Sequence, residues 1–163
     1  MITEWRSIQS FPGYSVSDTG LVRNDDNDRI MTLMVNQFGI VNVGLTKNYV
    51  QYKRAVSILV AIAFLLPPPQ EAFDTPINLD GDRTNNRADN LLWRPRWFAS
   101  QYFKQFKSAP ISPASPLEEI DSGEKFGSPR EAAIRYGLKE MDIWLAAATQ
   151  SEVWPTYQRF REI

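Results

Sequence analysis

The stretch that decides the fold is residues 77–93, INLDGDRTNNRADNLLW, in which a short apolar run leads into a polar loop and apolar residues return at the end. Asp80-Gly81 predicts a tight turn after a strand, because Gly accepts a positive φ and Asp hydrogen-bonds to its own backbone. From Asn85 onward the pattern predicts about one and a half helical turns, capped by Asn85 or Asn86. The apolar weight of that helix comes from Leu91, Leu92 and Trp93.

The spacing of Asn and Asp residues in this stretch is that of a known motif. It resembles the D-G-x-x-x-N-N-x-x-x-N-L-x-W core of HNH nucleases, in the version found in phage and intron homing endonucleases. The resemblance implies a ββα fold that holds one divalent metal ion against the scissile phosphate, with a His on the strand to activate water. The scaffold positions that match are Asp80, Gly81, Asn85, Asn86, Asn90, Leu91 and Trp93.

The positions that would carry the chemistry depart from the family pattern. Asn78 occupies the place of the general base, and an amide takes up no proton at neutral pH. Ile77 occupies the preceding place, often an Asp metal ligand, and Ala99 stands where an Asn or His completes the metal site. Losing a general base costs about two to four orders of magnitude in rate. We therefore expect no catalytic residues and a residual site of Asp80 and Asn90, with no metal ion or a weakly held one at Asp80.

The N-terminal residues resemble a second module of the same enzymes. Residues 3–23 predict short strands with turns at Phe11–Tyr14 and at Asp18–Gly20. They fit the pattern W-x-x-I-x-x-F-x-G-Y-x-V-S-x-x-G-x-V-R of the nuclease-associated modular domain, which precedes the HNH core in many homing endonucleases. The resemblance implies a β-rich N-terminal module.

Two further segments connect this module to the core. Two or three strands are expected between Ile30 and Lys53, with Gly39 and Gly44 at bends or bulges. The run 55–64 is apolar throughout and predicts a buried helix. The three prolines at 67–69 are expected to end this helix.

The charge distribution indicates where a nucleic acid would bind. The chain is nearly balanced, with 18 basic and 19 acidic residues, but residues 83–107 hold six basic side chains and one acid. Aromatic residues are interleaved with these cations; we expect Trp97, Phe98 and Phe103 to pack inward and the cations to contact phosphates. The predicted DNA-binding residues are Arg23, Arg83, Arg87, Arg94, Arg96, Lys104 and Lys107. The chain has no Cys and no His, which excludes disulfides, thiolate sites and imidazole chemistry.

The C-terminal part is expected to be a separate small module. Residues 108–116 contain three prolines and predict an extended linker. A hairpin turning at Ser122-Gly123 is expected next, then a helix that starts at Ser128-Pro129 and ends at Gly137, and a second helix over 139–149. Helix, Gly turn and helix resemble the helix-turn-helix repeat that ends many homing endonucleases.

Two features of this module bear on its binding partner. The second helix carries Glu140 and Asp142, and acids at that position repel phosphates. A protein-binding surface made of Trp144, Trp154, Tyr157 and Phe160 is the alternative, although a module of about fifty residues needs such rings for its own core.

The sequence thus predicts an α+β protein with a β-rich N-terminal module (1–54), an HNH-like ββα core with a basic aromatic extension (55–107), a linker (108–116) and a helix-turn-helix-like module (117–163). The expected function is that of a catalytically degenerate, DNA-binding relative of HNH homing endonucleases, acting as a regulator or accessory factor of a phage or mobile element. Its expected partners are double-stranded DNA and a phage or host protein. The alternatives are an active HNH-type endonuclease or nickase that uses Mg²⁺ at a variant site, and a protein-binding module acting on a nucleic-acid enzyme. With no apolar run long enough to cross a membrane and no signal pattern, a cytoplasmic protein is expected, in the host cytoplasm if it is phage-encoded.

Overall fold

The structure is a computed structural model that describes residues 2–163, a mixed α+β chain. It divides into two compact units, the first ending at Arg96 and the second running from Trp97 to Ile163. The predicted boundary at residues 108–116 is therefore displaced, because those residues lie inside the second unit. None of the helices in the described part of the chain has the length and apolar character needed to cross a membrane.

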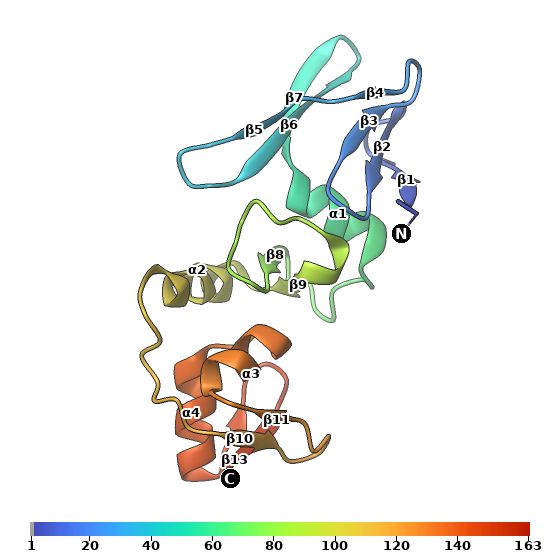
Figure 1. Ribbon diagram of the computed structural model, residues 1–163. Helices are drawn as coiled ribbons and strands as arrows, with labels where there is room; N and C mark the ends of the chain where they lie inside the picture. Colours follow the sequence, from blue (N-terminus) through green and yellow to red (C-terminus); the bar gives the residue numbers. More distant parts are fainter. Residues whose placement is uncertain (1) are drawn as a thin grey trace. The chain divides into compact units, whose positions relative to one another are not determined.

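The first unit begins with a four-stranded antiparallel sheet in the order β1-β2-β3-β4 (Figure 1). The turn predicted at Phe11–Tyr14 is confirmed, since Tyr14 N donates to Phe11 O at 3.3 Å. The turn ending at Gly20 is confirmed too, with a φ of +89° at that residue. The strands are β1 (Trp5–Ser7), β2 (Tyr14–Ser17), β3 (Val22–Asn24) and β4 (Arg29–Ile30).

A second sheet of three antiparallel strands follows, in the order β5-β6-β7. Gly39 lies in the β5–β6 turn with a φ of +77°, as predicted. Gly44 lies in regular register opposite Lys53, so the predicted bend or bulge there is wrong. A Cβ at Gly44 would lie 2.7 Å from Gln51 Nε2, and the glycine leaves room for that amide instead. The strands are β5 (Leu33–Val35), β6 (Val41–Lys47) and β7 (Val50–Ala55).

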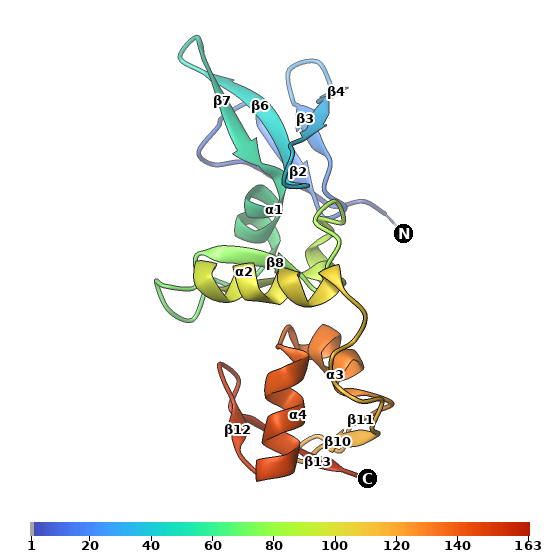
Figure 2. The same cartoon turned by 90° about the vertical axis from the view of Figure 1, so that its left-hand side faces the viewer.

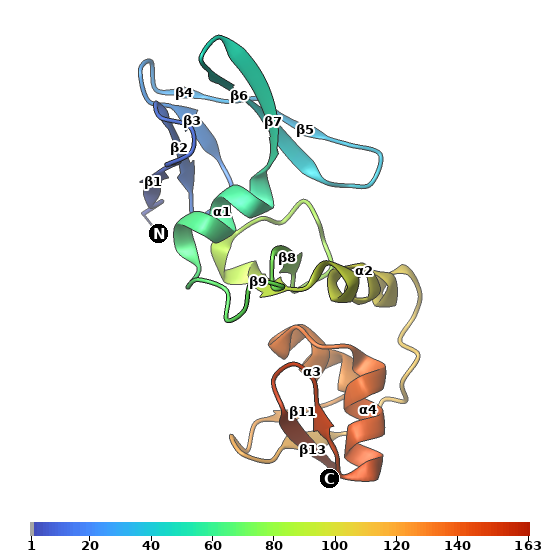
Figure 3. The same ribbon diagram turned by 180° about the vertical axis from the view of Figure 1, so that it is seen from behind.

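Helix α1 (Val56–Phe64) joins the elements of the first unit, because it contacts β2, β6, β7, β8 and β9 (Figure 3). Its buried residues are Val56, Leu59, Val60 and Ala61, whereas Ile62 is 69% exposed. The expected helix is present, but only one side of it is buried.

Residues 75–94 form a hairpin and not a strand followed by a helix. β8 (Thr75–Asn78) pairs with β9 (Leu91–Arg94), and only Ala88–Asn90 forms a single 3₁₀ turn, η1. The prediction of a helix from Asn85 is therefore wrong. The apolar residues expected on that helix lie in β9 and pair with β8, with Leu92 opposite Ile77. The tight turn at Asp80-Gly81 is confirmed, with Gly81 N donating to Asn78 O at 2.9 Å.

The second unit combines three α-helices with a four-stranded sheet in the order β11-β10-β13-β12 (Figure 2). The helix predicted to start at Ser128-Pro129 is confirmed as α3 (Pro129–Tyr136). Ser128 Oγ accepts a hydrogen bond from Glu131 N, and Gly137 ends the helix with a φ of +65°. The strands β12 and β13 were not predicted, since they depend on pairing between distant residues. The elements are α2 (Arg96–Lys104), η2 (Gln105–Lys107), β10 (Leu117–Glu119), β11 (Lys125–Phe126), α3 (Pro129–Tyr136), α4 (Glu140–Thr149), β12 (Glu152–Val153) and β13 (Gln158–Glu162).

Candidate functional site

The loop between β8 and β9 is held by side-chain amides. Asn78, at the end of β8, is 3% exposed. Its Nδ2 donates to Asn85 O at 2.8 Å and to Asn86 Oδ1 at 2.9 Å. Both donor hydrogens of this amide are thus used to fix the far side of the loop. Asn78, which the resemblance aligns with the general base, therefore holds the loop in this fold.

Asp80 is tied into the same loop through both carboxylate oxygens. Oδ1 accepts hydrogen bonds from Asn90 Nδ2 and from Asp82 N, each at 2.9 Å, and Oδ2 accepts one from Asn85 Nδ2 at 2.7 Å. Asn90 Oδ1 accepts in turn from Asp80 N at 3.2 Å. Three of the roughly four acceptor positions of this carboxylate are therefore used to hold the loop.

The other end of the loop is anchored by Asp82 and by the first sheet. Thr84 donates to Asp82 Oδ1 through its hydroxyl at 2.6 Å and through its backbone N–H at 2.9 Å, and these bonds lower the pKa of the Asp82 carboxyl. Ala88 N donates to Asp18 O at 2.8 Å, which attaches the loop to the β2–β3 turn. Turn and loop chemistry account for the retained Asn and Asp positions.

The residues present do not fit the divalent metal ion that the HNH resemblance implies. Within residues 2–163 no group of three or more His, Cys, Asp or Glu side chains lies in a metal-binding arrangement. Ile77 is apolar and fully buried, and Asp80 already has its hydrogen-bond partners. A hard divalent cation needs several free oxygen ligands, which this loop does not bring together.

A substitution at Asn78 is expected to reduce stability. Asn78→Ala removes two hydrogen bonds from a buried position and leaves Asn86 Oδ1 without this partner, so the free energy of unfolding should fall by about 2 kcal/mol. Urea unfolding of the full chain measures it. The matched control is Asn27→Ala, which removes one exposed turn contact, the hydrogen bond from Arg29 N at 3.0 Å, and should cost less than about 1 kcal/mol. Equal losses in the two variants would show that Asn78 does not hold the loop.

The predicted DNA-binding cations differ in their availability. Arg23 is engaged within the first unit, with Nε 3.3 Å from Asp25 Oδ1 and its guanidinium carbon 4.6 Å from the centre of the Trp5 ring. Arg94 is only 7% exposed and donates to Trp93 O at 2.8 Å, which does not fit the predicted phosphate contact. Arg87 is at the surface and pairs with Asp89 at 3.3 Å.

The remaining predicted cations are accessible but belong to different parts of the chain. Arg83 is partly exposed in the β8–β9 loop, where its side chain packs beside Gly39. Arg96 is exposed at the start of α2, and Lys104 and Lys107 are exposed in the second unit. The basic stretch 83–107 is therefore divided between the two units.

A polar sheet face in the first unit was missed by the sequence analysis. Val41, Val43 and Leu45 of β6 are buried, so the alternate residues of β6 lie on the other face of the β5–β6–β7 sheet (Figure 1). Cross-strand partners share a face. The register thus gives an outer face of Met34, Asn42, Gly44, Thr46, Gln51, Lys53 and Ala55. Alternation of apolar and polar residues over 41–46 was the sequence signal for it.

This outer face has the chemistry of base recognition. Asn and Gln amides suit adenine, Lys suits guanine or phosphate, and the Thr methyl suits thymine. The segment 41–55 contains three cations and no acid. Beyond the short β5, residues 44–53 of β6 and β7 form a two-stranded antiparallel ribbon, and such a ribbon fits the major groove of B-DNA.

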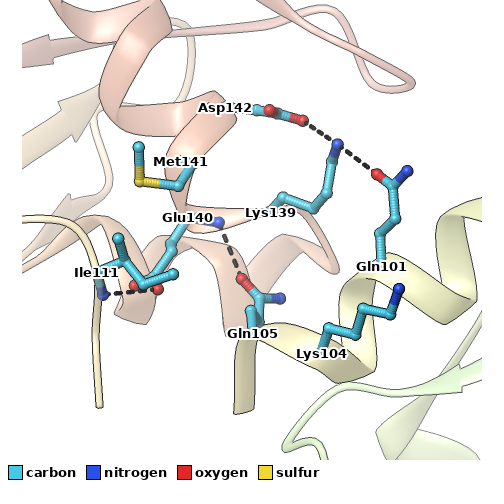
Figure 4. A pocket seen from close by; sticks show the side chains of 8 residues that line it. All are labelled: Gln101, Lys104, Gln105, Ile111, Lys139, Glu140, Met141 and Asp142. Atoms are coloured by element: carbon cyan, nitrogen blue, oxygen red, sulfur yellow. Dashed lines mark hydrogen bonds and ion pairs between the residues drawn. The ribbon is translucent and has the colours of Figure 1, made fainter. Parts of the chain in front are cut away.

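Glu140, the acid expected to repel phosphate, is buried in the second unit at 1% exposure (Figure 4). Arg130 of α3 donates to its two oxygens at 3.0 and 3.2 Å, and Ile111 N and Ser112 Oγ each donate at 3.1 Å. Burial alone would raise the pKa of the Glu140 carboxyl, but the hydrogen bonds from Arg130, Ile111 and Ser112 outweigh it and the pKa is lowered. The carboxylate is neutralised internally and presents no charge to a ligand.

The same contacts revise the expected linker. Residues 111 and 112 are attached to Glu140, and Arg130 also donates to the carbonyl oxygens of Ser108 and Gln105. The segment 108–116 is therefore packed, and it is not a free spacer. Its prolines leave extended backbone whose N–H and hydroxyl groups reach the buried carboxylate.

The second acid of α4 is also paired. Lys139 Nζ lies 3.0 Å from Asp142 Oδ2 and donates to Gln101 Oε1 at 2.9 Å (Figure 4). These residues and Lys104 line a hollow of about 240 Å³. Since Lys139 and Asp142 pair with each other at this hollow, we assign it to the packing of α2 against α4.

The aromatic residues of the second unit divide between core and surface. Phe98 and Phe160 are buried, as expected for core residues. Trp97 is 55% exposed and stacks on Trp154 with ring centres 5.2 Å apart, so the expectation that it packs inward is only partly met. Tyr157 is 61% exposed and does not belong to the core.

Comparison with known proteins places this architecture among HNH endonucleases in fold. The HNH homing endonuclease I-HmuI, which binds and cleaves DNA, matches with a TM-score of 0.56 over 98% of both chains, at 20% sequence identity. At that identity the match shows the fold alone. No protein-family model matches the chain.

Two curated relatives match in sequence, both uncharacterised HNH endonucleases of Acanthamoeba polyphaga mimivirus. One is 31% identical over 93 residues, which is 57% of this chain and 27% of the relative. The other is 32% identical over 92 residues, which is 55% of this chain and 23% of the relative. The matched region spans about a quarter of the length of these relatives. Sequence and fold therefore both support kinship with HNH endonucleases.

Proposed function

We propose that this chain is a DNA-binding relative of HNH homing endonucleases that docks on duplex DNA without cutting it, as a regulator or accessory factor of a phage or mobile element. The observation that supports it is the state of Asn78. The amide stands in place of the general base, is buried, and donates both hydrogens to loop oxygens. No proton acceptor of the required basicity stands at this place to activate water.

The size of the catalytic deficit follows from the missing groups. Losing the general base costs about two to four orders of magnitude in rate. The Asp80 carboxylate, which accepts three hydrogen bonds within the loop, would be left as a single metal ligand, and a hard divalent cation needs several. The uncatalysed hydrolysis of a phosphodiester is very slow. A scaffold without a general base and metal ligands should therefore give no measurable cutting.

The docking surface in this proposal is the outer face of β5–β6–β7 together with Arg83. Gly39, in the turn between β5 and β6, adjoins the Arg83 side chain, so the sheet and the β8–β9 loop form neighbouring parts of the first unit. Amides on the sheet face would read base edges, while Lys53 and Arg83 would contact phosphates. The helices α3 and α4 form a helix-turn-helix-like pair and are a second candidate contact, with Glu140 internally neutralised.

The test is to measure binding and cutting on the same preparation. A gel-shift assay with duplex DNA at low and moderate salt should show binding that weakens steeply as salt rises. Supercoiled plasmid incubated with Mg²⁺ or Mn²⁺ should remain uncut at protein concentrations that saturate the gel shift. Nicking that stops when the divalent ion is chelated would contradict the proposal that catalysis is lost. Absence of binding at low salt would contradict the proposal that the chain binds duplex DNA.

A further inference from the structure

The turn between β6 and β7 carries an unusual residue. Lys47 pairs with Val50, so the loop consists of Asn48 and Tyr49 alone. Both have positive φ, +51° and +63°. Two-residue turns of this type favour Asn-Gly, because the second residue then has no Cβ to clash with its own backbone. Asn48 fits its position, whereas Tyr49 carries a steric penalty that Gly would not.

The ring of Tyr49 contributes nothing to the folded unit that would offset this penalty. The side chain is fully exposed, at 104% of its reference area. It makes no hydrogen bond, ring stack or cation–π contact with any residue in the described part of the chain. Figures 1 and 2 show the β6–β7 turn at the end of the hairpin that lies away from α1.

The surroundings of the turn fit a nucleic acid. The flanking strands contain Lys47, Lys53 and Arg54 and no acidic residue between 41 and 55. The polar outer face of the sheet leads directly to the turn. An aromatic ring at the edge of a cationic surface can stack on a base or wedge against a base step, whatever the sequence.

We propose that Tyr49 contacts DNA with its ring, stacking on or wedging against a base at one end of the docked duplex. This inference rests on the proposed function, and it places Tyr49 at one end of the proposed DNA-binding sheet face. The opposite end of the sheet is the β5–β6 turn, where Gly39 adjoins Arg83. The seven residues of β6 separate the two ends. At about 3.3 Å per residue this is about 23 Å, or about seven base pairs at roughly 3.4 Å each.

The experiment replaces Tyr49 by Gly and measures two properties of the full chain. The thermal midpoint should stay the same or rise by a few degrees, because the left-handed conformation suits Gly. Affinity for a fluorescein-labelled duplex of mixed sequence at low salt should fall by about tenfold, because one stacked ring is lost. Tyr49→Phe should keep wild-type affinity, since it retains the ring.

A matched control is Tyr157→Gly in the second unit, where another exposed Tyr has a φ of +57°. It relieves the same kind of backbone penalty and should leave affinity within about twofold of wild type. Hydroxyl-radical footprinting on a defined duplex should lose protection at one edge only in Tyr49→Gly. Wild-type affinity and footprint in Tyr49→Gly would overturn the inference while leaving DNA docking standing, and would point to a protein as the partner of the ring. Failure of the wild-type chain to bind any duplex would overturn both.

Discussion

Replacing Glu140 by Ala is expected to lower the free energy of unfolding of the second unit by about 3–5 kcal/mol, because it leaves the Arg130 guanidinium without its buried counter-ion. Four hydrogen-bond contacts, from Arg130, Ile111 N and Ser112 Oγ, converge on this carboxylate, which is 1% exposed. They join the segment 108–116 to α3 and α4. Urea unfolding of the full chain, followed by Trp fluorescence, measures the change.

An exposed ion pair of the same unit provides the control. Arg159 and Asp121 lie 3.1 Å apart with side chains 50% and 65% exposed. Asp121→Ala should cost less than about 1 kcal/mol, because solvent screens the pair. If Glu140→Ala cost no more than this control, Glu140 would not be the group that holds these elements together.

The same carboxylate gives a pH dependence with a defined sign. The pKa of Glu140 in the folded protein lies below its ordinary value of 4.5. A carboxyl group with a lowered pKa stabilises the fold at pH values above its ordinary pKa, and this contribution disappears as pH falls through the lowered value. The stability difference between the wild-type chain and Glu140→Ala should therefore be largest near neutral pH and shrink below about 4.5. A difference that grew on acidification would contradict the assignment.

Charge reversal on the outer face of the β5–β6–β7 sheet is expected to have the largest effect on DNA binding. Replacing Gln51 and Lys53 together by Glu should weaken binding to duplex DNA by about a hundredfold at low salt, because an amide and a cation are exchanged for two anions facing phosphates. The slope of log affinity against log salt should fall by about one, which reports the lost phosphate contact of Lys53. Both values come from a fluorescence titration repeated at several salt concentrations.

The matched control makes the same change in charge on the first unit away from this face. Arg29 and Gln70 are both exposed and lie outside this sheet, and replacing them together by Glu changes the net charge as much as the double substitution on the sheet. That variant should lose less than about fivefold in affinity, since only long-range repulsion is added. Equal losses in the two variants would mean that overall charge, and not this sheet face, determines binding.

Local turn and cap chemistry was predictable because it depends on neighbouring residues. Gly20 and Gly81 were expected in turns and have φ values of +89° and +79°. Ser128 and Gly137 were expected to begin and end a helix, and they do. The differences from the HNH motif at Ile77, Asn78 and Ala99 are residue identities that the sequence gives directly, and their effect on activity stays a prediction.

The errors fall where distant residues decide the outcome. The run from Leu91 to Trp93 has the apolar weight of a helix but forms a strand, because β8 offers a partner for it. Glu140 was expected to repel phosphates, yet it is buried and bonded to an arginine ten residues earlier and to a backbone N–H of the segment 108–116. The outer sheet face needed the register of three strands before its residues could be grouped.

The sequence by itself determined the turns, the caps and the resemblance to the HNH motif, with an amide at position 78. Each of these depends on residue type and short spacing along the chain. Only the tertiary structure decided that Asn78 and Asp80 hold a loop, that Glu140 is neutralised within its unit, and that Asn42, Gln51 and Lys53 share one face. These depend on hydrogen bonds and strand pairing between residues far apart in sequence, whose partners are fixed only when the chain folds.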